Sequence, residues 1–116
     1  MFASMSISRS IARHLALAGV TCFSISAVNH AHASQDLARQ KACLACHQVN
    51  KAVLGPSFSD VAKKYKGNKK AADQLAQKIR KGGGGVWNMP MGPMPAQGQV
   101  SESEAKQLAN WILATK

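Results

Sequence analysis

Two cysteines and a histidine form the densest group of reactive side chains in the sequence. They read Cys43-Leu44-Ala45-Cys46-His47, so both thiols and the imidazole fall within five residues. Two thiols at this spacing add across the two vinyl groups of haem, and the histidine that follows is then delivered to the iron as an axial ligand. The motif therefore predicts covalent attachment of one haem through Cys43 and Cys46, with His47 as the proximal ligand.

Three other uses of this motif explain its residues less well. A thioredoxin-like redox pair requires a strand–helix–strand context, and the chain shows no strand-like run. A structural zinc site needs four ligands, typically supplied as two separated pairs. A simple disulfide leaves His47 without a role, although it is the only histidine after residue 33.

All methionines after the first five residues lie in one proline-rich segment, Met89-Pro90-Met91-Gly92-Pro93-Met94-Pro95. Methionines that fill a core normally follow helical spacing, whereas prolines at this frequency exclude a helix and favour a stiff, extended loop. Such a loop suits holding a thioether against the iron, and His/Met ligation raises the reduction potential of haem. We expect one of these methionines to be the second axial ligand, and the pattern alone leaves open which one.

Residues 1–33 differ from the rest of the chain and have the layout of a secretory signal peptide. Arg9 and Arg13 form a basic start, an apolar run follows, and Ala31-His32-Ala33 fits a small-x-small cleavage site. The apolar run is shorter than the ~20 residues needed to span a bilayer. We expect cleavage before Ser34, a periplasmic location, one domain over residues 34–116 and no stable membrane insertion after cleavage.

The predicted mature domain is strongly basic. The whole chain has a net charge of +10, and only two of its 15 basic residues, but none of its 5 acidic ones, precede residue 34. This excess favours an acidic protein surface, an anionic membrane or nucleic acid as partner. Secretion and the scattering of the few aromatic residues argue against nucleic acid. Basic residues concentrate between Lys63 and Lys81, either as a solvated face or as a surface that steers an acidic redox partner.

Apolar residues recur with helical spacing in four segments, which predicts an all-α chain. The expected helices cover residues 36–46, a segment from residue 57 or 59 to 65, and about residues 69–81. A last helix begins at a capping box formed by Ser101 and Glu104. Four consecutive glycines, residues 82–85, predict a turn close to the haem edge, where side chains would collide. Trp87 follows, either as a core aromatic or as a hydrogen-bond donor to a haem propionate.

The sequence resembles the short bacterial class I cytochromes c of the c-551/c-552 type over essentially residues 36–115. Several segments carry the resemblance in the right order: Cys43-Leu44-Ala45-Cys46-His47, Gly55-Pro56-Ser57-Phe58, Asp60-Val61-Ala62-Lys63-Lys64-Tyr65, Gly85-Val86-Trp87, Pro93-Met94-Pro95-Ala96, Val100-Ser101 and Trp111-Ile112-Leu113. The resemblance implies about four helices wrapped round one haem c. It also implies a one-electron carrier without substrate turnover of its own.

The resemblance also assigns roles to single residues. Pro56 supplies the carbonyl that accepts the ring N–H of His47, as metal-binding histidines commonly require. Met94 is the distal iron ligand, Trp87 faces a propionate, and the Gln97 amide approaches the ligand sulfur. The stretch from Trp87 to Met94 is about two residues longer than the family pattern, which makes Met91 a rival ligand.

The implied activity is electron transfer between respiratory donors and a terminal reductase or oxidase. Redox partners of the oxidase, nitrite reductase or peroxidase type, with acidic docking surfaces, would suit a basic, monomeric carrier. A haem enzyme or gas sensor would need an open iron position, which the methionine loop argues against. A fixed relay subunit of a larger oxidoreductase is a further alternative that the sequence leaves open.

Overall fold

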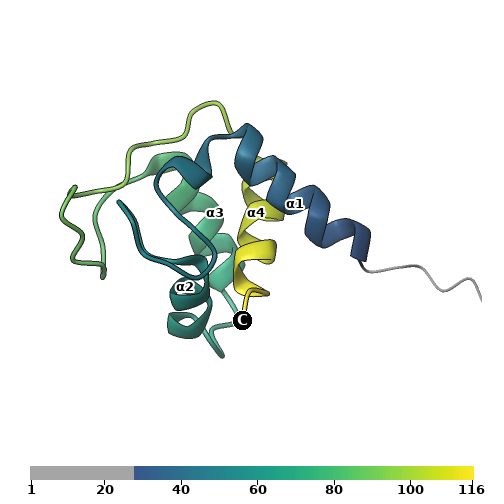
Figure 1. The fold of residues 1–116 in the computed structure, drawn as a ribbon, viewed down its shortest axis with the longest axis horizontal. Helices are drawn as coiled ribbons and strands as arrows, with labels where there is room; N and C mark the ends of the chain where they lie inside the picture. Colours follow the sequence, from purple (N-terminus) through teal and green to yellow (C-terminus); the bar gives the residue numbers. More distant parts are fainter. Residues whose placement is uncertain (1–27) are drawn as a thin grey trace, which may run out of the picture.

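The computed structural model describes residues 28–116, with side chains from Ser34 onward. Its helices are α1 (Val28–Gln40), the short 3₁₀ helix η1 (Cys43–Ala45), α2 (Phe58–Lys64), α3 (Ala71–Lys81) and α4 (Glu102–Leu113) (Figure 1). No strand occurs within these residues, and the all-α fold with four α-helices is confirmed. None of the helices in residues 28–116 is both long and apolar enough to cross a membrane. Most of the predicted leader, residues 1–27, lies outside the described part of the chain.

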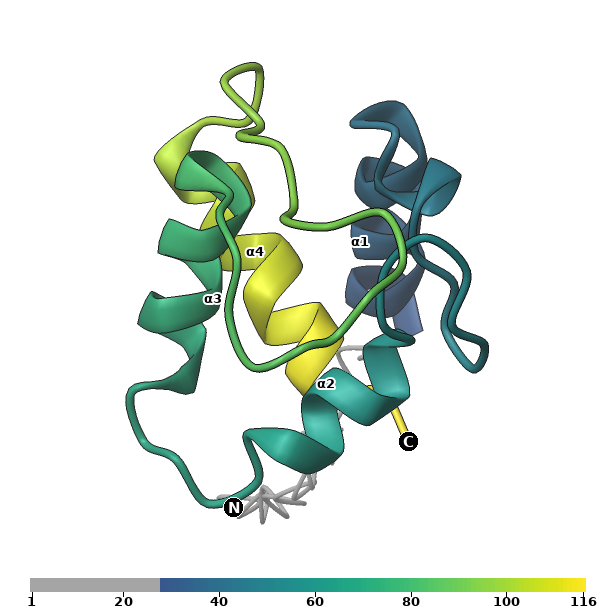
Figure 2. The same ribbon diagram turned by 90° about the vertical axis from the view of Figure 1, so that its left-hand side faces the viewer.

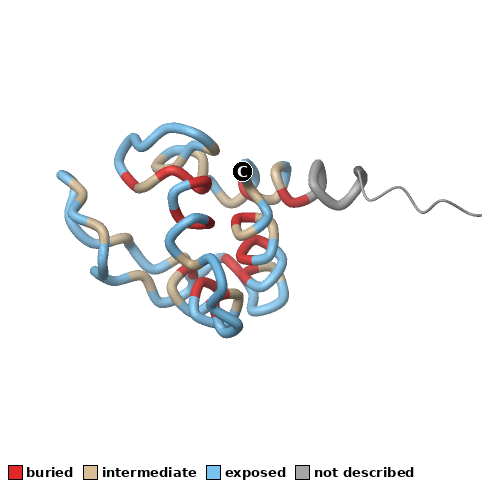
Figure 3. Tube along the Cα trace, turned by 90° about the horizontal axis from the view of Figure 1, so that it is seen from below, coloured by how far each residue is buried: buried red, intermediate tan, exposed pale blue. Residues whose placement is uncertain are grey.

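Helix α4 is the element against which α1, α2 and α3 all pack. Its first turn carries the predicted capping box: the Ser101 hydroxyl accepts the Glu104 backbone N–H at 3.2 Å, and the Glu104 carboxylate accepts the Ser101 N–H at 2.9 Å. The inner face of α4 is buried and consists of Ala105, Leu108, Ala109 and Ile112. Figure 3 shows that buried positions of the whole domain gather between the helices. Burial of this stripe orients the other three helices round α4.

The prediction of one helix from Asp36 to Cys46 is wrong at both ends, because α1 begins at Val28 and stops at Gln40. Ala42 adopts a left-handed conformation with φ 60° and ψ 18°, which a right-handed helix does not accommodate. The chain then forms η1 as a separate turn. Lys41 fixes this corner, since its ammonium donates to the Gln99 carbonyl at 3.1 Å and lies 3.0 Å from the Glu104 carboxylate.

A long loop, residues 82–101, joins α3 to α4. Helix α3 ends at Gly82, whose φ of 65° and ψ of −151° are accessible mainly to glycine. Figure 2 shows the loop running across the front of α4 towards the side of α1 and then returning to the end of α3. The loop thus faces the η1 corner across α4, and the space between them is the cavity that holds the candidate site.

Candidate functional site

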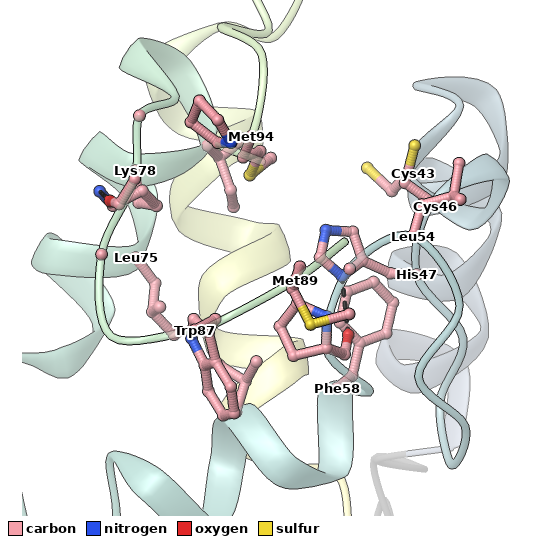
Figure 4. Close-up of a pocket in the computed structure, with 18 of the residues that line it drawn as sticks. Cys43, Cys46, His47, Leu54, Phe58, Leu75, Lys78, Trp87, Met89 and Met94 are labelled. Atoms are coloured by element: carbon pink, nitrogen blue, oxygen red, sulfur yellow. Dashed lines mark hydrogen bonds between the residues drawn. The ribbon is translucent and has the colours of Figure 1, made fainter. Parts of the chain in front are cut away.

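One cavity of about 600 Å³ brings together almost all residues that the sequence singled out. Its walls come from η1 and the segment that follows, from α2, α3 and α4, and from the loop after α3. Most lining side chains are apolar, and the volume lies in the range of pockets that enclose an organic cofactor. Figure 4 shows Cys43, Cys46 and His47 on one wall and Met94 on the other.

Cys43 and Cys46 are both free, half-buried thiols on the η1 corner. The 3₁₀ turn places their sulfur atoms towards the cavity from the same wall (Figure 4). Burial raises the pKa of the Cys43 thiol, and the charge of a Cys46 thiolate would raise it further. Both sulfur atoms thus face the cavity from one wall, where they could hold a cofactor covalently.

His47 directly follows the cysteines, and its ring is held on several sides. Its Nδ1 lies 2.8 Å from the Pro56 carbonyl oxygen. Because a carbonyl only accepts, Nδ1 must donate, which leaves Nε2 with a free lone pair for a metal. The Phe58 ring stacks on the imidazole at a centroid distance of 5.2 Å and an interplanar angle of 19°.

Gly55 closes the remaining side of the imidazole. A Cβ at this position would lie 2.4 Å from Cε1 and 2.7 Å from Nδ1 of His47, closer than real side chains approach. The Gly55 backbone N–H also donates to the Cys46 carbonyl at 2.8 Å. The segment 55–58 therefore packs directly on the ring and fixes the direction of its Nε2 atom.

Met94 occupies the opposite wall, and its backbone is fixed to the end of α3. It forms an antiparallel bridge with Gly83, in which the Gly83 N–H donates to the Met94 carbonyl at 2.7 Å and the Met94 N–H donates back at 3.3 Å. Gly82 packs so closely that a Cβ there would lie 2.4 Å from the Met94 oxygen. Figure 4 shows the Met94 side chain directed into the cavity from this fixed segment.

Met89 and Met91 also line the cavity, but they lie on a separate turn. The turn is closed by the Gly92 N–H, which donates to the Met89 carbonyl at 3.1 Å. Met91 is 66% exposed, whereas Met89 is half-buried and lies near Phe58, on the side of His47 (Figure 4). Of the two methionines labelled in Figure 4, Met94 faces His47 from the opposite wall and Met89 does not.

Trp87 and Gln97 differ in their relation to the cavity. Trp87 is half-buried and lines it, with the Lys64 ammonium 5.2 Å from the centroid of its ring. Gln97 does not line the cavity. Its amide nitrogen donates to the Pro95 carbonyl at 3.0 Å and its amide oxygen accepts from Gln99 at 2.8 Å. The approach of this amide to the ligand sulfur stays a prediction.

Sequence reasoning missed three residues of the site: Gly55, Phe58 and Lys78. Gly55 lies directly before Pro56 and Phe58 two residues after it, and neither of them has a predicted role at the site. Lys78 was counted among the charged surface residues, yet it lines the cavity. Its position three residues after buried Leu75 and next to buried Ile79 was the available signal, because it marks the border of an apolar stripe.

These residues fit a planar, covalently attached cofactor with two axial ligands. Two thiols and an imidazole with a free Nε2 form one wall, a thioether faces them, and the space between is largely apolar. Together with the all-α fold, this arrangement defines the class of c-type haem proteins.

Comparisons with known proteins agree with this class. The family model for cytochrome c matches residues 31–116. Cytochrome c-552 of Hydrogenobacter thermophilus is 55% identical over 84 residues, which cover 72% of this chain and 83% of the relative. Cytochrome c-551 of Azotobacter vinelandii is 46% identical over 83 residues, 71% of this chain and 96% of the relative. The crystal structure of wild-type Nitrosomonas europaea cytochrome c552 matches with a TM-score of 0.67 and 48% identity, covering 71% of this chain and 99% of that one.

The chain therefore belongs to the cytochrome c family, as a short class I member. It carries one covalently attached haem c and acts as an electron carrier between redox proteins, not as an enzyme.

Proposed function

We propose that this protein is a periplasmic, monomeric one-electron carrier whose haem is attached through Cys43 and Cys46 and ligated by His47 and Met94. The observation that carries the proposal is the placement of Met94 and His47 on opposite walls of one apolar cavity (Figure 4). Haem c, when bound, supplies an iron that alternates between Fe(III) and Fe(II). The protein residues set how readily it does so.

Each side chain of the site contributes a separate physical effect. The Met94 thioether is neutral and favours Fe(II), which raises the reduction potential. The Pro56 carbonyl orients His47 and makes the imidazole a better electron donor, which acts in the opposite direction. Trp87, at the rim of the same cavity, is placed to donate its indole N–H to a propionate. The apolar lining excludes water and so limits reorganisation when the charge on the iron changes.

The mouth of the cavity suits brief contact with a redox partner. Leu54, Val86 and Met91 line the cavity and remain 40%, 62% and 66% exposed. Lys64 and Lys78 contribute positive charge near the same loop. A small apolar contact within a basic surround favours transient, salt-sensitive docking of an acidic surface. We propose a terminal reductase, oxidase, nitrite reductase or peroxidase as the electron acceptor.

The periplasmic assignment rests on the amino-terminal residues. Residues 1–33 have the three parts of a secretory signal peptide, and the family match begins only at residue 31. Cleavage before Ser34 would leave every residue that lines the cavity, since the first of them is Ala38.

Visible absorption of the protein from a periplasmic fraction tests the proposal. The account predicts haem that stays with the polypeptide after denaturing extraction, and a low-spin spectrum in both redox states. The Fe(III) state should show the weak long-wavelength band of sulfur-to-iron charge transfer. Haem that is removed by extraction, or a high-spin spectrum that changes with carbon monoxide, would contradict it.

A further inference from the structure

Met91 lies at the tip of a tight turn in the loop between α3 and α4. The turn runs from Met89 to Gly92 and is closed by the Gly92 N–H, which donates to the Met89 carbonyl at 3.1 Å. Pro90 fixes the first of its two central positions, because the proline ring restricts φ, and Gly92 takes a φ of 78° that favours glycine. Met91 is the second central residue and is 66% exposed. The turn therefore presents one thioether to solvent.

The other two methionines of the loop are less accessible. Met89 and Met94 are both half-buried. Figure 4 shows the Met94 side chain directed into the cavity and Met89 near Phe58. In the proposed carrier a lone pair of the Met94 sulfur is also engaged with the iron. An oxidant that arrives from solvent therefore meets the Met91 sulfur first.

Met91 also belongs to the apolar rim of the cavity. Among the side chains that the structure describes, the exposed large apolar ones are Val53, Leu54, Val86 and Met91, of which Met91 is the most exposed. All of them except Val53 line the cavity, and Val53 adjoins Leu54 in the chain. Met91 alone among the four carries a sulfur atom. Chemistry at this one atom therefore changes the character of the rim.

A hydroperoxide is the class of oxidant that reacts at such a thioether. Its terminal oxygen forms a bond to the Met91 sulfur while the O–O bond breaks, so the sulfur loses two electrons and the peroxide gains them. The proton of the terminal oxygen moves to the departing oxygen, which leaves as an alcohol or as water. The product is a sulfoxide, which is polar where the thioether was apolar. Burial of a sulfoxide against a partner costs free energy unless the partner supplies a hydrogen-bond donor.

We propose that Met91 is a modification site at which a hydroperoxide forms a sulfoxide, and that this weakens docking of the acidic redox partner without disturbing the haem. The inference rests on the proposed docking at the cavity mouth and on the proposed ligation by Met94. The reaction leaves the basic charge of the surface unchanged, so the long-range attraction persists and only the apolar contact is lost. Methionine sulfoxide reductases restore the thioether, which makes the change reversible.

The first measurement identifies the methionine that is oxidised. The Fe(III) holoprotein is treated with a limiting amount of tert-butyl hydroperoxide, and tandem mass spectrometry of its peptides locates the added oxygen. Met91 should be converted before Met89 and Met94, and the sulfur-to-iron band should stay. Oxygen that enters Met89 or Met94 first would overturn the inference.

The second measurement uses a gold electrode coated with a mixed monolayer of methyl- and carboxylate-terminated thiols, since this probe offers an acidic surface with apolar groups. Voltammetry gives the amount of adsorbed haem protein. Protein oxidised at Met91 should adsorb roughly 10-fold more weakly than untreated protein, with little change on a monolayer of carboxylates alone. Met91→Gln should show the weaker adsorption without peroxide. Met91→Leu should stay insensitive to peroxide, whereas Met89→Leu, the matched control, should respond like wild type.

Unchanged adsorption on the mixed monolayer after oxidation of Met91 would overturn the inference. An equal loss in peroxide-treated Met91→Leu, or wild-type adsorption of Met91→Gln, would overturn it as well. Failure of the proposed function gives different results. A wild-type protein without the sulfur-to-iron band before any peroxide, or loss of that band as oxygen enters Met91, would refute Met94 ligation itself. Untreated protein that adsorbs equally on mixed and pure carboxylate monolayers would refute the proposed apolar contact at the cavity mouth.

Discussion

On one wall of the cavity His47 is held by direct contacts to its ring, whereas on the other wall Met94 is held through its backbone. The imidazole has the Pro56 carbonyl at 2.8 Å, the Phe58 ring stacked on it and Gly55 packed against it. The Met94 side chain depends on a bridge to Gly83 at the end of a loop rich in glycine and proline. A ring enclosed in this way has few alternative positions, whereas a thioether on a loop can move with the loop.

The two walls thus have different tasks in the proposed carrier. One attaches the haem and supplies His47, and the other supplies Met94. The His47 wall also contains the two cysteines, Cys43 and Cys46. The Met94 wall can be adjusted without disturbing attachment, because Met94 is connected to the end of α3 through its backbone bridge to Gly83 and not through the cysteines. We therefore expect substitutions on the two walls to change different measurable properties.

Removal of the Met94 thioether should have the largest effect on the iron. Met94→Ala should lose the sulfur-to-iron band completely and expose the iron to carbon monoxide, while the haem stays covalently attached. Met89→Ala and Met91→Ala are the matched controls on the same loop, and both should keep the band. Loss of the band in Met91→Ala alone would show that the longer loop places a different methionine at the iron.

Gly82→Ala should weaken the Met94 wall through the backbone. The φ of 65° and ψ of −151° at this residue cost a residue with a side chain about 1–3 kcal/mol. In addition, the new Cβ would meet the Met94 oxygen at 2.4 Å and the Ala96 nitrogen at 2.6 Å. Urea unfolding of the holoprotein should show that the free energy of unfolding falls by about 3 kcal/mol. Free imidazole, which competes with the Met94 thioether for the iron, should also bind more tightly. Gly98→Ala, where an added Cβ meets nothing within 4 Å, is the control.

Gly55→Ala should disturb the other wall instead. Its Cβ would meet the His47 ring at 2.4 Å, and overpacking of this kind typically costs about 1–3 kcal/mol. The measurement is urea unfolding alongside the yield of protein with covalently attached haem, and both should fall. If imidazole affinity rises as much in Gly55→Ala as in Gly82→Ala, the two walls are not independent and the comparison between them is wrong.

Glu104→Gln should give the smallest effect. Glu104 lies on α4 and pairs with Lys41, which precedes η1 and the His47 wall. The hydrogen bond from the Ser101 backbone and the contacts with Lys41 lower the pKa of the Glu104 carboxyl. A lowered folded-state pKa means that the ionised group stabilises the fold above the ordinary glutamate value of about 4.3, and that this contribution disappears as the pH falls through the lower folded value.

Urea unfolding of wild type and Glu104→Gln, at pH 7 and in steps below about pH 4, tests this direction of the change in stability with pH. The variant should be the less stable protein at pH 7, and the difference should shrink towards zero on acidification. Glu102→Gln, which removes the same charge from the same first turn, is the control. A stability difference that persists unchanged at the lowest pH would contradict an electrostatic origin.

Much of this molecule follows directly from its residue pattern. The apolar stripe and capping box of α4 predict its start and its buried face, because both depend on local spacing. The motif around Cys43 predicts the attachment wall for the same reason. The end of α1 could not be predicted, since Ala42 adopts a left-handed conformation that alanine rarely takes and that contacts distant in sequence must stabilise. The place of Lys78 in the cavity likewise depends on how α3 meets the loop after it.

The choice of Met94 as distal ligand is tested most directly by NMR of the reduced holoprotein with labelled methionine methyl groups. Only three methionines lie after residue 33, so three methyl signals are expected from the mature domain. A methyl group held above the haem plane is shifted far upfield by the ring current. The account predicts one such signal, absent in Met94→Ala and retained in Met89→Ala and Met91→Ala. A shifted signal that disappears with Met89 or Met91 instead, or no shifted signal at all, would contradict it.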